Sequence, residues 1–139
     1  MGTMFQKVTV YSDGGARGNP GAAAFGVVVK DENGAIIKEY AEYIGNATNN
    51  IAEYLGLIKG LELALEIGAE RVDCYLDSEL VVKQLKREYK VKNENLQKLF
   101  IRAWNLSTKF KKVTYTHIRR EFNTEADALL NAVLDDHAK

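Results

Sequence analysis

Apolar and polar residues recur with two different periods along the chain, and the period predicts the secondary structure. Residues 51–67 carry apolar side chains at every third or fourth position, the spacing of one face of an amphipathic helix. Residues 5–12 instead alternate between apolar and polar, as in a half-buried strand. By these criteria we expect strands over 5–12, 23–30, 35–44, 71–77 and 112–118, and helices over 51–67, about 78–87, about 93–108 and 124–136.

The order of these elements predicts the topology of the sheet. Asp31–Gly34 is a hairpin signal between the second and third strands, so the chain should open with antiparallel strands. The later strands follow helices, and such crossovers join parallel strands in a right-handed sense. We therefore expect an α/β fold with a five-stranded mixed sheet, its first three strands antiparallel, then parallel crossovers, and helices on both faces. The first, fourth and fifth strands should be parallel neighbours.

Composition narrows the class of protein. The 139 residues are 46% hydrophobic with a single proline, which fits one globular domain over 1–139. No apolar run approaches the roughly 20 residues that span a membrane, and the lone Cys74 lies in an apolar stretch, so we expect a cytoplasmic protein with a buried free thiol. Nothing in the sequence demands an oligomer, so we expect a monomer. The formal net charge is zero, which weighs against a strong nucleic-acid binder. The cations nevertheless cluster, most densely between residues 83 and 92.

Four carboxylates occupy strand ends and helix starts, where α/β proteins place functional groups. Asp13 follows the first strand and opens a glycine-rich turn over 14–21, and Asp77 ends the fourth strand. Glu53 and Asp127 lie in the first turns of two helices. A structural role is open for each acid alone. An N-cap at Asn50 would put Glu53 at the third helical position, Thr124 to Asp127 fits a capping box, Asp77 could cap the next helix and Asp13 could form an Asx-turn.

Convergence of all four acids would serve metal-dependent chemistry, which capping does not require. Hydrolysis of a phosphodiester needs an activated water and a stabilised leaving oxygen, and two cations about 3.5–4 Å apart supply both. Carboxylate ligands favour Mg²⁺, with Mn²⁺ as a substitute. For the two-cation chemistry we expect two ions per site once substrate is bound. Zinc has little support, because the chain contains only His117 and His137 as imidazole ligands. Walker A, dinucleotide-binding and serine-hydrolase motifs are absent from the sequence.

Four motifs, at residues 11–21, 48–54, 77–81 and 120–127, resemble those of type 1 ribonuclease H, in the same order along nearly the whole chain. The resemblance is greatest to the compact archaeal and bacterial branch. It implies a ribonuclease H-like fold and an endonuclease that cuts the RNA strand of an RNA–DNA hybrid, leaving 5′-phosphate and 3′-hydroxyl ends. Double-stranded RNA is an open second substrate.

The resemblance also assigns roles to the acids. Asp13 would bridge both metals, Asp127 would share the ion that activates water, and Glu53 and Asp77 would hold the ion facing the leaving oxygen. Many relatives carry a histidine in a loop before the last aspartate, and Arg120 is our candidate to replace it, with a surface ion pair to Glu121 or Glu125 as the alternative.

Substrate-binding positions follow from the same resemblance. An RNA–DNA hybrid displays 2′-hydroxyls in a wide, shallow minor groove, and the glycine turn would allow a close backbone approach to it. The residues expected to contact the hybrid are Gly14, Asn19, Thr48, Asn49, Asn50 and Ser78, with Thr48 on a DNA phosphate. Capping or turn formation is the alternative for the three asparagines. His117 is expected to end a strand, as a packed or half-exposed side chain rather than a catalyst.

Two other functions remain open at this point. One is a nuclease of the same fold with another target, such as a junction resolvase or an exonuclease. Exonucleases of this kind place an acid two residues after the first aspartate, where this chain has Gly15. The other is a non-catalytic hybrid-binding module, which an intact set of four mutually repelling carboxylates disfavours.

Overall fold

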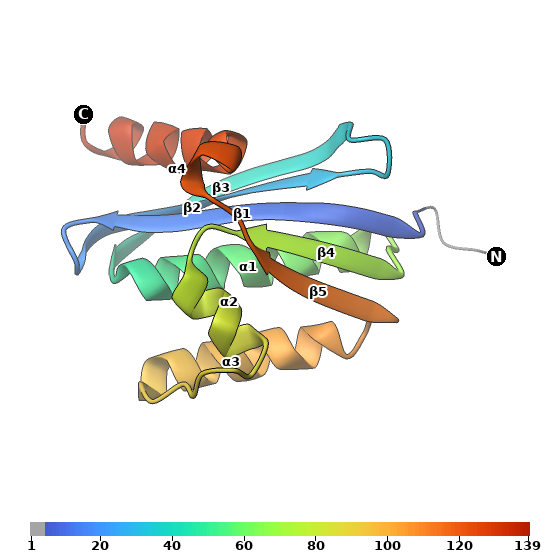
Figure 1. The fold of residues 1–139 in the computed structure, drawn as a ribbon. Coiled ribbons are helices and arrows are strands. Elements are labelled where there is room, and N and C mark those ends of the chain that lie inside the picture. The colour runs from blue at the N-terminus through green and yellow to red at the C-terminus, as the bar shows by residue number, and fades with distance from the viewer. Residues whose placement is uncertain (1–4) are drawn as a thin grey trace.

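A single mixed sheet with helices on both faces organises residues 5–139, the part of the chain that the computed structural model describes (Figure 1). The strands are β1 Lys7–Arg17, β2 Gly21–Lys30, β3 Ile36–Ala47, β4 Arg71–Leu76 and β5 Lys112–His117. The helices are α1 Asn49–Glu66, α2 Glu79–Leu85, α3 Glu94–Ser107 and α4 Thr124–His137, with a 3-10 turn η1 at Arg120–Phe122.

The strands lie in the order β3-β2-β1-β4-β5. The pairs β1–β2 and β2–β3 are antiparallel, whereas β1–β4 and β4–β5 are parallel. The predicted mixed sheet is confirmed, including the parallel neighbours β1, β4 and β5. The central strand β1 thus carries Asp13 into the middle of the sheet, next to the carboxyl end of β4.

The two faces of the sheet are covered unequally. Helices α1, α2 and α3 lie on one face and α4 lies alone on the other (Figure 1). Val10 of β1, Val27 of β2 and Leu61 of α1 are completely buried in the larger core, which also takes in the predicted buried thiol of Cys74. Leu130 and Leu134 anchor α4. None of the helices in residues 5–139 is both long and apolar enough to cross a membrane.

The glycine-rich segment after Asp13 is strand rather than turn, so the turn predicted over 14–21 is wrong. β1 continues to Arg17, and Gly14 pairs with Phe25 of β2. The turn is confined to residues 18–20, where Gly18 adopts φ +91°. A Cβ on Gly14 would lie 2.3 Å from the carbonyl carbon of Ala52. Glycine is therefore required here because β1 and α1 pack backbone against backbone.

Helices α1 and α2 are capped by hydroxyl side chains. Thr48 accepts a hydrogen bond from the N–H of Ile51 at 3.2 Å, so the N-cap predicted at Asn50 is wrong by two residues. Ser78 accepts from the N–H of Val81 at 3.3 Å, so Asp77 does not cap α2. In both helices the hydroxyl oxygen accepts a hydrogen bond from the free N–H three residues on, so the start of the helix is capped without a charged group. The carboxylate of Asp77 is left available for other contacts.

The start of α4 also differs from the prediction. Asn123 occupies the N-cap position and Thr124 is the first helical residue, so the capping box predicted from Thr124 to Asp127 is wrong. The side chain of Asn123 makes no hydrogen bond to the helix that it precedes. Its contacts are made instead with β1 and with Asp77.

Candidate active site

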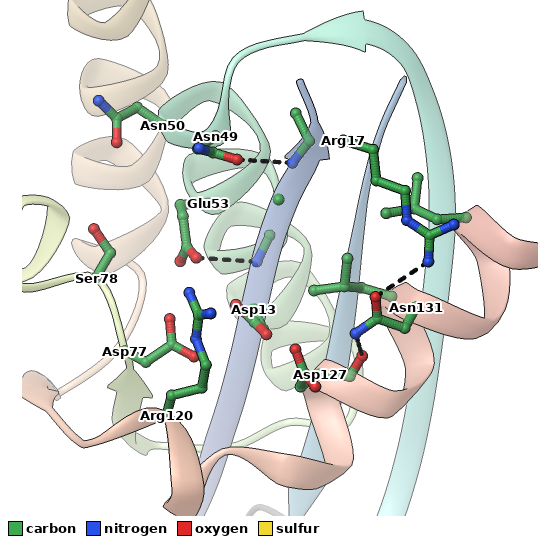
Figure 2. Close-up of a pocket in the computed structure, with 15 residues that line it drawn as sticks. Asp13, Arg17, Asn49, Asn50, Glu53, Asp77, Ser78, Arg120, Asp127 and Asn131 are labelled. Carbon is green, nitrogen blue, oxygen red and sulfur yellow. Dashed lines mark hydrogen bonds between the residues drawn. The ribbon is translucent and has the colours of Figure 1, made fainter. Parts of the chain in front are cut away.

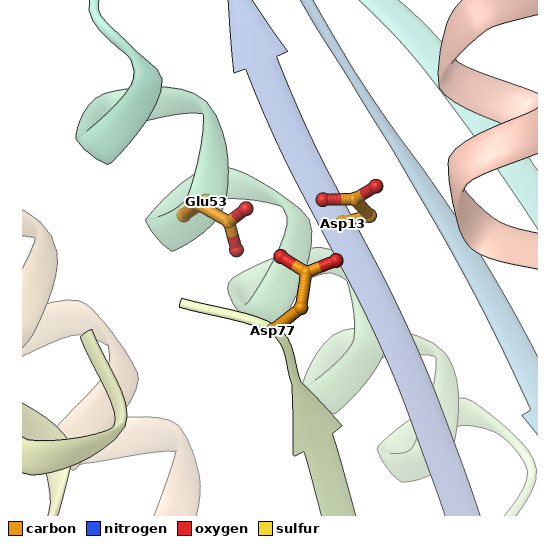
Figure 3. A group of neighbouring side chains, drawn as sticks. All are labelled: Asp13, Glu53 and Asp77. Atoms are coloured by element: carbon orange, nitrogen blue, oxygen red, sulfur yellow. The ribbon is translucent and has the colours of Figure 1, made fainter. Parts of the chain in front are cut away.

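Three carboxylates meet where β4 ends beside β1. Leu76 is the last residue of β4 in register with Ser12, so Asp77 leaves the sheet next to Asp13. Glu53 approaches from the first turns of α1, and the three side chains point toward one another (Figure 3). Each of the three offers an oxygen within 4.8 Å of the others. The predicted convergence of Asp13, Glu53 and Asp77 is therefore observed.

Two of these carboxylates are almost fully buried. Asp13 is 4% exposed and Glu53 is 5% exposed. The backbone N–H of Gly14 donates to Glu53 Oε1 at 3.2 Å, whereas Oε2 of Glu53 has no hydrogen-bond partner within residues 5–139. Burying a carboxylate oxygen without a partner is unfavourable unless a cation or a proton neutralises it.

The pKa values of the buried acids also show that their charged forms are unfavourable in this environment. Burial, reinforced by the charges of Glu53 and Asp77, raises the pKa of Asp13 to about 10. Burial and the charge of Asp77 raise the pKa of Glu53 to about 8, against the opposing hydrogen bond from Gly14. Without a cation, the fold therefore favours the protonated forms of two acids that are normally ionised at neutral pH.

Asp127 and Arg120 complete the wall of an open cleft of about 500 Å³ (Figure 2). Asp127 lies outside the tight group of three but within hydrogen-bonding reach of Asp13, an interaction that also raises the pKa of Asp13. The positive charge of Arg120 acts in the opposite direction on the pKa of Glu53. All four predicted acids and the predicted arginine thus line a single cleft.

The alternative proposed for Arg120, a surface ion pair with Glu121 or Glu125, is not observed within residues 5–139. Glu121 lies 3.7 Å from Arg119 and Glu125 pairs with Lys30 at 2.6 Å. His117 is the last residue of β5, as predicted, but its side chain is exposed rather than packed or half-exposed. It does not line the cleft.

The residues expected to bind substrate divide into two groups. Gly14, Asn49, Asn50 and Ser78 line the cleft, whereas Asn19 and Thr48 do not. Asn19 contacts the start of α1, which lines the cleft, because its Oδ1 accepts a hydrogen bond from the backbone N–H of Asn49 at 3.1 Å. The Oδ1 of Asn49 in turn accepts the N–H of Ala16 at 2.8 Å (Figure 2).

Sequence reasoning missed two groups of residues at the site. Asn123 is 1% exposed and donates to Ser12 and Asp77, contacts separated by more than 40 positions in sequence. On the opposite rim, Arg17 donates to Asn131 at 3.4 Å and pairs with Asp135 at 2.5 Å. Arg17 and Asn123 lie within the motifs at 11–21 and 120–127, but hydrophobic periodicity and capping patterns do not predict these contacts, because they depend on how α4 lies against β1.

A hard divalent cation fits this group of ligands. Carboxylate oxygens are the only ligands in the cluster, and the unpartnered Oε2 of Glu53 lies where an additional positive partner is needed. Such oxygen-only sites bind Mg²⁺ or Mn²⁺ in preference to zinc, which takes nitrogen and sulfur ligands.

Comparison with known proteins gives a consistent family. A family model described as reverse transcriptase-like matches residues 11–133. A bifunctional protein of Mycobacterium tuberculosis is 42% identical over 134 residues, which are 96% of this chain and 37% of that protein. The chain thus spans little more than a third of that relative. Ribonuclease HI of Halobacterium salinarum is 43% identical over 94% of this chain and 65% of its own length. The ribonuclease H of Chlorobium phaeobacteroides is 30% identical over 96% and 99%.

Solved structures agree with these sequence relatives. The N-terminal RNase H domain from Mycobacterium tuberculosis superposes with a TM-score of 0.92 at 43% identity, over 95% of this chain and 96% of that one. The Halobacterium salinarum enzyme gives 0.91 at 43% identity, over 94% and 98%. A ribonuclease H solved in complex with an RNA/DNA hybrid gives 0.89 at 39% identity, over 95% and 99%. The chain belongs to the type 1 ribonuclease H family.

Proposed function

We propose that this protein is a metal-dependent endoribonuclease that hydrolyses the RNA strand of RNA–DNA hybrids and leaves 5′-phosphate and 3′-hydroxyl ends. The observation that carries the proposal is the buried cluster of Asp13, Glu53 and Asp77, with an unpartnered oxygen on Glu53. Family membership and the hybrid complex of a relative at 39% identity support the choice of substrate.

The four carboxylates would hold the ions. Asp13, at the centre of the group, would contribute to both ion sites, with Glu53 and Asp77 on one side and Asp127 on the other. Two bound divalent ions, Mg²⁺ or Mn²⁺ in its place, would activate a water and stabilise the leaving oxygen. The backbone N–H of Gly14 fixes one oxygen of Glu53, which orients the carboxylate before any ligand arrives.

Arg120 would act on the scissile phosphate. Its guanidinium lies in the cleft with the acids, although the residue itself is exposed (Figure 2). A guanidinium donates to phosphate oxygens in a planar, bidentate geometry and stays protonated throughout. Arg120 would therefore steady negative charge on the phosphate without taking part in proton transfer.

The polar wall formed by α1 and the β1–β2 turn would receive the minor groove. Asn49 and Asn19 use their carbonyl oxygens within the protein, and Thr48 uses its hydroxyl oxygen as an acceptor. Their N–H and O–H donors have no acceptor within residues 5–139 and would serve 2′-hydroxyls and phosphates. Asn50, Ser78 and the backbone of Gly14 complete this surface in the cleft.

The deciding experiment is a cleavage assay on matched labelled duplexes. RNA–DNA, RNA–RNA, DNA–DNA and single-stranded RNA would each be incubated with EDTA, Mg²⁺ or Mn²⁺. We expect metal-dependent internal cuts confined to the RNA strand of the hybrid. Cuts in RNA–RNA as well would extend the substrate range, and cuts only in DNA would point to another nuclease of this fold. Binding without cleavage under every condition would refute the enzymatic function and favour a hybrid-binding module.

A further inference from the structure

Asn123 makes two buried hydrogen bonds that converge on the carboxylate cluster. Its side-chain Nδ2 donates to the backbone carbonyl of Ser12 at 2.9 Å and to Oδ2 of Asp77 at 3.3 Å. A backbone carbonyl and an ionised carboxylate both accept hydrogen bonds and cannot donate them. The NH₂ group of Asn123 must therefore face both partners. The orientation of the Asn123 amide is therefore fixed by its surroundings.

This arrangement departs from what an asparagine at this position normally does. Asn123 is the N-cap residue of α4, and asparagine is among the preferred N-caps because its oxygen accepts a helical N–H. Here no such bond forms, and Oδ1 of Asn123 is buried without a partner, as is the hydroxyl of Ser12. The side chain of Asn123 contacts Ser12 and Asp77 instead of capping α4. Positions where the structure departs from the local sequence preference are often functional.

The backbone of Asn123 reaches a third carboxylate. Its carbonyl oxygen accepts the N–H of Asp127 at 3.1 Å in the first turn of α4. One residue therefore contacts the residue before Asp13, the side chain of Asp77 and the backbone of Asp127. These attachments lie on β1, on the end of β4 and on α4, the three elements whose relative placement determines how Asp127 meets the other acids.

We propose that Asn123 is a positioning residue that holds Asp77 in register with Asp13 and Asp127 and thereby sets the affinity of the cluster for divalent cations. The inference rests on the proposed function for its catalytic consequence but not for its effect on metal binding. Hydrogen bonds that orient carboxylate ligands act in this way, and their loss typically lowers metal affinity or activity about 10- to 100-fold.

The test compares two variants of Asn123 with a destabilised control. Asn123→Ala removes the donor. Asn123→Ser places a side chain that is favoured at N-cap positions before α4 but is too short to reach Asp77. Val29→Ala, in the completely buried part of β2, lowers stability without touching the site. Calorimetric titration with Mn²⁺ and with Mg²⁺, without substrate, gives the Kd, and thermal melting in EDTA gives the stability. Cleavage of the hybrid gives kcat, KM and the Mg²⁺ concentration for half-maximal rate.

For both Asn123 variants we expect the metal Kd and the half-maximal Mg²⁺ concentration to rise about 10-fold or more, while KM for the hybrid stays within about twofold. Val29→Ala should melt earlier and keep the parent's metal dependence. Unchanged metal binding in both Asn123 variants, or an equal shift in Val29→Ala, would overturn the inference. If the parent binds metal but cuts no hybrid, the proposed function fails, and the calorimetry still decides the role of Asn123.

Discussion

At the scale of single residues, the carboxylate cluster is electrostatically unfavourable unless a cation or a proton neutralises it. Asp13 and Glu53 are nearly sealed from solvent and lie against Asp77. The carboxylate of Glu53 accepts the backbone N–H of Gly14 and lies within hydrogen-bonding reach of the carboxyl group of Asp13. A cluster of this kind is costly in a purely structural role, because like charges in a low-dielectric site repel one another. The geometry is explained if the folded state is completed by metal.

Removing the charge of Asp13 tests this directly. Asp13→Asn preserves the shape of the side chain but removes the central negative charge from the cluster. We expect the rate of hybrid cleavage to fall by about 10²- to 10³-fold or more, as for loss of a major electrostatic contribution. The melting temperature in EDTA should rise, because the neutral amide is buried beside Glu53 and Asp77 without the proton that Asp13 must take up on folding.

The control for this substitution is Asp136→Asn, an exposed aspartate in the last turn of α4. It removes the same charge far from the cluster and should leave both the rate and the melting temperature close to those of the parent. An Asp13→Asn protein that cuts as fast as the parent would exclude the proposed role of the carboxylates.

The raised pKa values also predict how metal-free stability depends on pH. The pKa of Asp13 rises from 3.8 to about 10 and that of Glu53 from 4.5 to about 8, in both cases chiefly through burial. Between these limits the folded state binds more protons than the unfolded state, so stability is fully present below about pH 4 and is lost as pH rises toward 8 and then 10. Other groups contribute a background, which the Asp13→Asn variant shares.

Melting in EDTA at pH 5, 7 and 9 measures this effect as the difference between parent and Asp13→Asn. We expect the variant to gain on the parent by at least about 5 °C between pH 5 and pH 9. Saturating Mg²⁺ should abolish most of that difference, because the cation takes the place of the protons. A difference that stays constant with pH would contradict the assignment of the shift to these acids.

The acids could be found in the sequence because each follows a readable pattern, an apolar run for Asp13 and Asp77 and a helix start for Glu53 and Asp127. Asn123 could not, since its partners Ser12 and Asp77 lie 111 and 46 positions away. Its sequence context, just before a helix, predicts a cap instead. Long-range hydrogen bonds of a buried amide leave no local signature.

At the scale of elements, the contact between β1 and α1 positions two of the acids. Small residues let the strand approach the helix, and at Gly14 the backbone of α1 leaves no room for a Cβ. From sequence, the glycines were interpreted as a turn, since glycine is common in turns and in close backbone contacts alike. Periodicity predicted the helix correctly, but it cannot tell these two uses of glycine apart.

Alanine substitutions at the adjacent Gly14 and Gly15 test whether close packing between β1 and α1, rather than the loss of a glycine as such, determines stability. In Gly14→Ala the new Cβ would meet the backbone of Ala52 and Glu53 at 2.3–2.5 Å, so β1 and α1 must move apart. We expect a loss of stability of about 1–3 kcal/mol and a large loss of activity as Glu53 is displaced. Gly15→Ala is the matched control, because its Cβ would meet nothing closer than 3.9 Å. Urea denaturation measures both variants, and equal losses at the two positions would refute the packing argument.

At the scale of the whole molecule, charge is balanced in number but not in position. The chain has 19 basic and 19 acidic residues, yet the carboxylates of the site lie together in one cleft and cations gather after α2. Lys86, Arg87, Lys90 and Lys92 are all exposed there. A hybrid whose scissile phosphate enters the acidic cleft needs positive contacts elsewhere along its backbone, and this basic segment, residues 86–92, is our candidate for them.

Salt dependence tests that arrangement, because each phosphate neutralised by the protein releases counterions and steepens the fall of affinity with salt. Replacing Lys90 and Lys92 by alanine should weaken hybrid binding and reduce the slope of log K against log salt by about two, one for each contact. The exposed pair Lys38 and Lys139 gives the control with the same change in net charge. Binding is measured by fluorescence anisotropy with Asp13→Asn in the background, so that the hybrid is not cut. If both pairs change the slope equally, the effect comes from net charge alone; if only the first pair does, residues 86–92 contact the nucleic acid while the four acids act on it.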